Sequence, residues 1–259
     1  MTSRSINILK NIAIYELFRY NISGDFMQRY FAEKKINDKF ILLDSDLRHI
    51  KKVMRMKPLD EIIVVYDNKS YLCYLNDEYE IILKETLNEQ IDKLPEISLI
   101  VPILKEQKLD YILQKSTELG VSKIILYYSE RGIVKENEKG IKKLERWKMI
   151  LKEASEQSHR NTIPKIEIMN LNEIIKLEGI NIVCSTIEKS RTIKNVLKTS
   201  SKYDRINLVI GPEGGLTEKE ENKLLENNFI PVTLGNRILR VETVPLFIMS
   251  IVNYECMEW

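Results

Sequence analysis

The feature that most constrains the fold of this chain starts after Pro95. There, apolar runs alternate with segments whose apolar residues recur at helical spacing. Residues 97–104 form an apolar run interrupted only by Ser98, and residues 107–119 carry apolar side chains at helical spacing and stop at Gly120. Continuous apolar runs predict strands that are buried on both faces. The alternation continues to a final helix expected over residues 242–256, and it predicts a mostly parallel sheet covered by helices.

The other elements of this C-terminal part follow from the same two patterns. Thr217 and Glu220 form a capping box that marks the start of one helix. Strands are expected at residues 122–128, 182–184, 206–210 and 230–234, and helices at 139–158, after Ser190 and from Thr217.

Residues 27–95 follow a different pattern of short strands and tight turns. Apolar runs occur at residues 40–43, 61–66, 71–75 and 79–83, and one helix is expected from an N-cap within residues 44–46 to Arg55. This pattern predicts a small β-barrel domain. Residues 1–26 are expected to be an extension without a fold of its own. The short join near Pro95 predicts that the two domains, 27–95 and 96–259, pack closely.

Composition excludes several kinds of site. Cys73, Cys184 and Cys256 are too far apart for a disulfide framework or a zinc site, and two histidines are too few for a histidine-based metal site. We therefore expect no metal and a reducing, cytoplasmic location. The longest late apolar run, residues 244–252, is too short to span a membrane.

The net charge of +2 hides strongly charged stretches. Residues 29–57 hold nine basic and four acidic side chains, residues 60–96 hold three and ten, and residues 131–165 hold ten and five. Basic residues beside aromatics, as in Arg29-Tyr30-Phe31, suit phosphate contact and base stacking. A solvated face whose charges mix in three dimensions explains the same pattern, so charge alone leaves both interpretations open.

Two glycine-containing loops, residues 208–217 and 234–243, are the most informative motifs. Each follows an apolar strand and precedes a helix, and ligands bind beyond the carboxyl ends of such strands. The first loop, Ile-Gly-Pro-Glu-Gly-Gly, lacks the Lys-Ser/Thr of a phosphate-binding loop and the spacing of a dinucleotide fingerprint. A single loop of this kind is usually only a turn. A second loop that carries Arg237, Arg240 and Glu242 favours a binding site.

The two loops together resemble the signature of the bacterial 16S ribosomal RNA uracil-N3 methyltransferases, which belong to the SPOUT class of S-adenosylmethionine-dependent enzymes. Further similar segments occur in the family's order between Met27 and Ser250: residues 27–31, His49, and residues 53–58, 108–110, 114–120, 131, 146–147 and 153–160.

The resemblance implies an N-terminal PUA-like β-barrel followed by an α/β domain with a C-terminal trefoil knot, working as a homodimer. It also implies methylation of N3 of a specific uridine in 16S rRNA within the small ribosomal subunit. S-adenosylmethionine would be held by backbone groups of Ile210, Gly211, Gly215, Leu234, Gly235, Ile238 and Leu239.

Several positions depart from the family pattern. Leu59 stands where the family usually has glycine in a barrel turn, which we expect to change the turn type. Asn236 replaces a proline in the second loop, and Val244 is expected to narrow the wall of the cofactor site. Pro245 is tolerable only in the first turn of the final helix.

The chemistry of this reaction suggests roles for individual residues. Removal of the N3 proton makes the uracil anionic, and Arg240 or Arg237 would stabilise that charge. Glu242 is a candidate base, but its place at a helix N-terminus favours a structural or capping role. RNA phosphates are expected to contact Arg29, Arg48, Lys51, Lys52, Arg55 and Arg160. A ribose 2′-O-methyltransferase and a non-catalytic RNA-binding module remain alternatives; a nucleotide hydrolase is disfavoured by the missing Lys-Ser/Thr.

Overall fold

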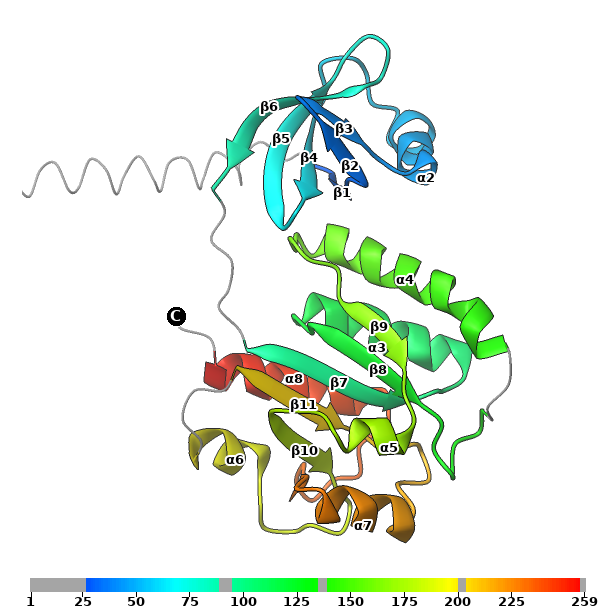
Figure 1. Cartoon of the computed structure of the whole chain (residues 1–259), viewed down its shortest axis with the longest axis vertical. Coiled ribbons are helices and arrows are strands. Elements are labelled where there is room, and N and C mark those ends of the chain that lie inside the picture. Colours follow the sequence, from blue (N-terminus) through cyan, green and yellow to red (C-terminus); the bar gives the residue numbers. More distant parts are fainter. Residues whose placement is uncertain (1–26, 89–94, 135–138, 200–203, 257–259) are drawn as a thin grey trace, which may run out of the picture.

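The computed structural model describes residues 27–88, 95–134, 139–199 and 204–256. The predicted extension, residues 1–26, lies outside them. The described elements form two sheets, a curled one above and a parallel one below it in Figure 1. None of the helices in these ranges is both long and apolar enough to cross a membrane.

The N-terminal sheet has six short strands in the order β1-β4-β5-β6-β3-β2 and curls into a half-barrel (Figure 1). Every pairing is antiparallel except the parallel pair β1 and β4. Asp67 and Asn68 both have positive φ, as a tight hairpin requires. The strands are β1 (Arg29–Phe31), β2 (Lys34–Ile36), β3 (Lys39–Ile41), β4 (Glu61–Tyr66), β5 (Lys69–Leu75) and β6 (Ile81–Leu87).

One helix closes the half-barrel, and its ends differ from the prediction. Helix α2 (Asp44–Arg48) continues into a π-helical turn, η1 (His49–Val53), whose Ile50 is fully buried in the core of the half-barrel. The N-cap is Leu43, which offers no side-chain hydrogen bond, so the predicted polar cap within residues 44–46 is wrong. The polar residues lie instead inside the first turn, where Asp46 faces the second domain.

The C-terminal sheet confirms the prediction of a parallel sheet. Its six strands run in the order β12-β10-β11-β7-β8-β9, and every pairing is parallel. Strand β9 was missed because Lys165-Ile-Glu-Ile168 is short and half charged. The strands are β7 (Glu96–Pro102), β8 (Lys123–Tyr127), β9 (Lys165–Ile168), β10 (Ile180–Cys184), β11 (Arg205–Val209) and β12 (Ile230–Val232).

Helices cover both faces of this sheet because alternate strand residues point to opposite sides. Leu99 belongs to the core beneath α3, α4 and α8, whereas its neighbour Ile100 belongs to the core beneath α5 and α7. Pro245 lies in the first turn of α8, as expected. The helices are α3 (Glu106–Glu118), α4 (Lys139–Gln157), α5 (Leu171–Ile174), α6 (Ile193–Thr199), α7 (Glu218–Glu226) and α8 (Thr243–Cys256).

A buried polar interface joins the half-barrel to helix α4 (Figure 1). Lys152 of α4 donates to Asp46 of α2 at 2.9 Å and to Glu156 at 2.6 Å. Glu156 also accepts the backbone N–H of Phe31 at 3.2 Å. Burial raises the pKa of Glu156 despite the hydrogen bond from Lys152. The two parts of the chain therefore pack closely, through buried charged groups that pair with one another.

Candidate functional site

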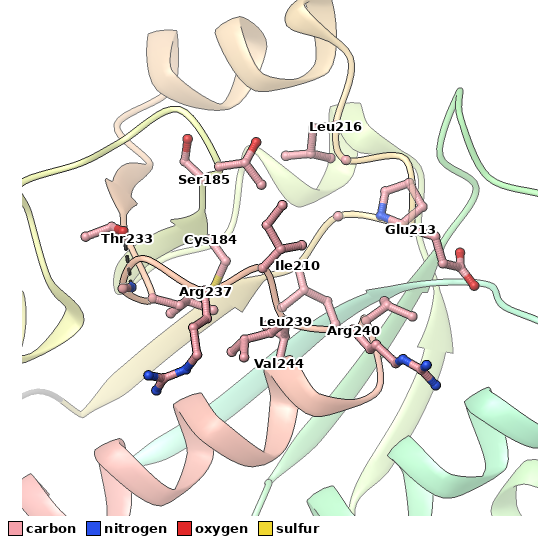
Figure 2. A pocket seen from close by; sticks show the side chains of 18 of the residues that line it. Cys184, Ser185, Ile210, Glu213, Leu216, Thr233, Arg237, Leu239, Arg240 and Val244 are labelled. Atoms are coloured by element: carbon pink, nitrogen blue, oxygen red, sulfur yellow. Dashed lines mark hydrogen bonds between the residues drawn. The ribbon is translucent and has the colours of Figure 1, made fainter.

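A cavity of about 670 Å³ lies beyond the carboxyl ends of β10, β11 and β12. Its walls come from the segments that follow these three strands and from the start of α8 (Figure 2). The volume is typical of a small-molecule site. Both glycine-containing loops line this one cavity. It includes Ile210, Gly211, Gly215, Leu234, Gly235, Ile238, Leu239 and Arg240 among its lining residues.

The first loop is held in one shape by hydrogen bonds from outside it. The buried hydroxyl of Tyr127 donates to the carbonyl of Ile210 at 2.8 Å. The guanidinium of Arg131 donates to the carbonyls of Gly214 and Leu216 at 3.1 and 3.2 Å. Gly215 has a φ of 71°, which a glycine adopts without strain. The loop therefore presents its backbone to the cavity in a preorganised form.

The second loop exposes more of its side chains. Gly235 has a φ of 100°, and its N–H donates to the Thr233 hydroxyl at 3.2 Å (Figure 2). Ile238 is 97% exposed, although it lines the cavity. Arg237 and Arg240 are both exposed and extend from the loop in different directions (Figure 2). The loop thus offers two exposed cations and one apolar side chain to a molecule that approaches the cavity.

Lys108 links the two loops at the rim of the cavity. Its ammonium nitrogen lies 2.9 Å from the Glu213 carboxylate and 3.7 Å from that of Glu242. The hydrogen bond to Glu213 raises the pKa of Lys108. Partial burial acts to raise the pKa of Glu213, but the hydrogen bonds to its carboxylate and the positive charges of Lys108 and Lys105 together outweigh it, and the pKa is lowered. Glu242 therefore lies beside the cavity, in a pair with a cation.

Lys108, Ser185 and Glu221 are among the polar residues at the site that the sequence analysis missed. The Ser185 hydroxyl donates to the buried carboxylate of Glu221, and it accepts the backbone N–H groups of Ile187 and Glu188. Ser185 directly follows the buried strand β10, and this position was a usable signal. Lys108 and Glu221 lie within helices, where no local pattern indicates a site.

The residues expected to contact RNA fall into two groups. Arg48, Lys51, Lys52 and Arg55 are exposed on the half-barrel, and the Lys51 ammonium lies 4.6 Å from the ring centre of Tyr79. Arg29 is only 5% exposed, which corrects the expectation that it contacts phosphate.

Arg29 and Arg160 both serve contacts within the chain. The Arg29 guanidinium donates to Asn161 at 2.5 Å and to Ser70 at 3.3 Å, so it joins the half-barrel to the segment after α4. Arg160 is half-buried and donates to the carbonyl of Thr117 at 2.7 Å. Burial lowers its pKa to about 10. Among the residues that the structure describes, no three His, Cys, Asp or Glu side chains are grouped to hold a metal.

Known proteins share both parts of this architecture. A family model described as an RNA methyltransferase domain matches residues 92–253, and one described as an RNA methyltransferase PUA domain matches residues 42–83. Fold and site together thus define an RNA methyltransferase with a PUA domain.

Relatives narrow this class to one family. Ribosomal RNA small subunit methyltransferase E of Bacillus subtilis is 33% identical over 88% of this chain and 97% of its own length. The protein of the same name from Mesomycoplasma hyopneumoniae is 34% identical over 86% of this chain and 98% of its own. The Neisseria gonorrhoeae enzyme of that name, solved bound to S-adenosylmethionine, is 31% identical with a TM-score of 0.79, covering 89% and 98% of the two chains. The chain belongs to the ribosomal RNA small subunit methyltransferase E family.

The cavity suits a ligand held by backbone groups and apolar walls. A Cβ atom added at Gly215 or Gly235 would meet no atom within 4 Å, so both glycines leave open space beside the backbone. Apolar side chains of Ile210, Leu239 and Val244 supply the walls. Val244 does line the cavity, as expected from its position.

Proposed function

We propose that this protein uses S-adenosylmethionine to methylate N3 of a specific uridine in 16S rRNA, within the small ribosomal subunit and in the cytoplasm. The observation that carries the proposal is the single cavity formed by both glycine-containing loops, with Arg237 and Arg240 at its edge. S-adenosylmethionine supplies an electrophilic methyl group. Backbone groups of Ile210, Gly211 and Gly215 would hold it, together with Leu234, Gly235, Ile238 and Leu239.

The side chains at the rim would act on the uracil. Arg240 places a positive charge where the uracil becomes anionic as N3 loses its proton, and a preorganised charge there stabilises the transition state. Glu242 is the candidate acceptor of that proton. Its pairing with Lys108 at 3.7 Å also supports the alternative that Glu242 positions the loop.

Variants of Arg240 test this role directly. Replacing Arg240 by alanine should lower kcat by about a hundredfold or more, while affinity for S-adenosylmethionine changes little. Arg237→Ala tests the alternative that Arg237 stabilises the charge, and its kcat should stay close to that of the wild type if Arg240 does so. An Arg240→Ala enzyme with unchanged kcat would contradict the role. Glu242→Gln should flatten the pH dependence of kcat if Glu242 accepts the proton.

Product analysis tests the proposed reaction. Small-subunit RNA from cells with and without the gene should differ by one N3-methyluridine, as measured by mass spectrometry. A missing 2′-O-methyl group instead would establish the sister reaction on ribose. Absence of heat on titration with S-adenosylmethionine would favour a non-catalytic RNA-binding module.

We also propose the finer architecture that the resemblance implies. Residues 27–95 form the RNA-binding PUA-like barrel, and residues 96–259 form the methyltransferase domain with a C-terminal trefoil knot. Support for the knot comes from Thr233, whose N–H donates to the carbonyl of Arg191 at 2.8 Å, so the chain after β12 runs beside the connection that leaves β10. An experimental chain trace without a crossing there would contradict the knot.

The proposed homodimer rests on the surface of α8. Phe247 and Tyr254 of this helix are exposed, although the helix is strongly apolar. Burial of such a surface against a second copy is favourable. Light scattering at micromolar concentration should give twice the chain mass of 30.5 kDa, and a monomer would contradict the proposal.

A further inference from the structure

The turn before β4 displays a leucine in a strained backbone conformation. Leu59 has a φ of 73° and is 76% exposed. Pro58 precedes it, and the N–H of Asp60 donates to the carbonyl of Lys57 at 3.1 Å, which is the pattern of a type II turn. Glycine is the usual residue at the position of Leu59. The turn therefore keeps the left-handed backbone, contrary to the expected change of type, and leucine bears the strain.

Hydrogen bonds on both sides prevent this turn from relaxing. The N–H of Leu59 donates to the carbonyl of Leu75 at 2.7 Å, and the N–H of Leu75 donates to the carbonyl of Asp60 at 3.1 Å. The Asp60 carboxylate accepts the N–H of Lys57 at 2.7 Å. The backbone is thus fixed to β5, and the Leu59 side chain is held toward solvent.

Four cations precede this apolar tip along the chain, and Asp60 and Glu61 follow it. Lys51, Lys52, Arg55 and Lys57 are all exposed, and Val53 is 65% exposed among them. Arg55 is also left-handed, with a φ of 53°. Exposed apolar side chains flanked by cations are what proteins use to wedge against bases while they neutralise phosphates. A strained backbone conformation whose side chain makes no contact that stabilises the fold is typical of a binding site.

We propose that Leu59 is an apolar wedge that packs against an unstacked base of the RNA substrate, while the exposed cations that precede it in the chain hold nearby phosphates. The choice of RNA rests on the proposed function and on charge complementarity. The turn also lies within residues 42–83, which match the PUA domain of RNA methyltransferases. An anionic membrane would share the charge preference, and the experiment below separates the two.

Replacing Leu59 by glycine in the full chain tests the wedge, because fold stability and RNA binding should respond in opposite directions. Strain is released, so the denaturant midpoint should stay the same or rise. Affinity for transcribed small-subunit rRNA should fall about tenfold, because the variant has no leucine side chain to bury against the RNA on binding. The salt dependence should stay unchanged, since no phosphate contact is removed. Leu59→Asn, which tolerates the same backbone, should weaken binding similarly.

Two control variants define the result. Arg55→Gln should weaken binding and reduce the slope of log K against log salt by about one. Leu225→Ser, on exposed α7 at the far end of the molecule, should change nothing (Figure 1). Unchanged RNA affinity of Leu59→Gly would overturn the proposal. So would a loss of binding to vesicles rich in phosphatidylserine with RNA affinity intact.

The product of the wild-type reaction separates this inference from the proposed function. If the product is not N3-methyluridine but Leu59→Gly still weakens RNA binding, the wedge stands and the proposed function fails. If N3-methyluridine forms with an unchanged KM for RNA in Leu59→Gly, the proposed function stands and the wedge fails.

Discussion

The hydroxyl of Tyr127 reaches across the parallel sheet to donate a hydrogen bond of 2.8 Å to the carbonyl oxygen of Ile210. Tyr127 ends β8, whereas Ile210 follows β11, and β7 lies between these two strands. The ring is 2% exposed, so the hydroxyl has been desolvated in the core. This bond therefore attaches the first residue of the cavity loop to the rigid centre of the sheet.

Tyr127→Phe removes this attachment with little change in shape. The carbonyl of Ile210 loses a buried donor, which should cost about 1–2 kcal/mol in the free energy of unfolding. KM for S-adenosylmethionine should rise several-fold, because the loop is less well held. Chemical denaturation and steady-state kinetics measure the two effects, with exposed Tyr111→Phe as the control. A KM equal to that of the control would show that the loop does not depend on this bond.

Gly211 and Gly214, in the same loop, should respond differently to substitution. A Cβ atom at Gly211 would lie 3.0 Å from the backbone nitrogen of Leu216, whereas one at Gly214 would lie 3.6 Å from the side chain of Arg131. Gly211→Val should therefore displace the loop and weaken S-adenosylmethionine binding at least about tenfold, without changing RNA affinity. Gly214→Ala should bind as the wild type does. Calorimetry that finds both variants equal would contradict this distinction.

Lys152 and Lys148 lie on the same helix, α4, but only Lys152 is buried. Lys152→Met leaves Asp46 and Glu156 without their shared cation, which should cost about 3–5 kcal/mol in the free energy of unfolding. Lys148 pairs with Glu145 in solvent, so Lys148→Met should cost at most about 0.5 kcal/mol. Urea denaturation measures both. If Lys152→Met lost as little free energy of unfolding as Lys148→Met, the buried interface would add no stability.

Arg29 and Lys52 should separate stability from RNA binding. Arg29→Ala removes a buried donor to Asn161 and Ser70, and it should lower the free energy of unfolding by about 2 kcal/mol. The salt dependence of RNA affinity should stay the same. Lys52→Ala should leave stability intact and reduce the salt slope by about one. A reduced slope for Arg29→Ala would restore Arg29 as a phosphate contact.

Cys73 and Cys184 should be unreactive in the folded protein at neutral pH. Burial raises the pKa of Cys73 and of Cys184 to about 12. Thiolate is the reactive form, and it forms only as pH rises toward that value. At pH 8 each thiol should therefore react with iodoacetamide about a thousandfold more slowly than in unfolded chain, with the rate rising tenfold per pH unit up to about pH 11. Mass spectrometry that finds Cys184 labelled rapidly at pH 8 would contradict the raised pKa of this thiol.

Local patterns predicted those elements whose signals lie within a few residues. Thr217 and Glu220 form the capping box of α7, as predicted. Gly120, predicted to stop the preceding helix, lies just after the end of α3 and has a φ of 89°. Strand β9 and the cap of α2 were missed or wrong, because both depend on neighbours from other parts of the chain. Strand β9 pairs with β8, and Asp46 turns toward Lys152, which is 106 residues away.

The sequence by itself determined the parallel sheet, the small strand-rich domain before it and the two loops that meet at the cavity, because apolar periodicity and glycine spacing act over short distances. The β-barrel predicted for the small domain is a half-barrel in the structure (Figure 1). Only the tertiary structure decided what the charged residues do. It buried Arg29 beside Asn161 and brought Lys108 to Glu213, which is 105 residues away. The strand order β12-β10-β11-β7-β8-β9 brings residues that are distant in sequence into contact within the C-terminal domain. Packing of β1 against α4 buries Arg29. A charged side chain has the same local signal whether it faces water or a partner, so its role depends on contacts that no local pattern encodes.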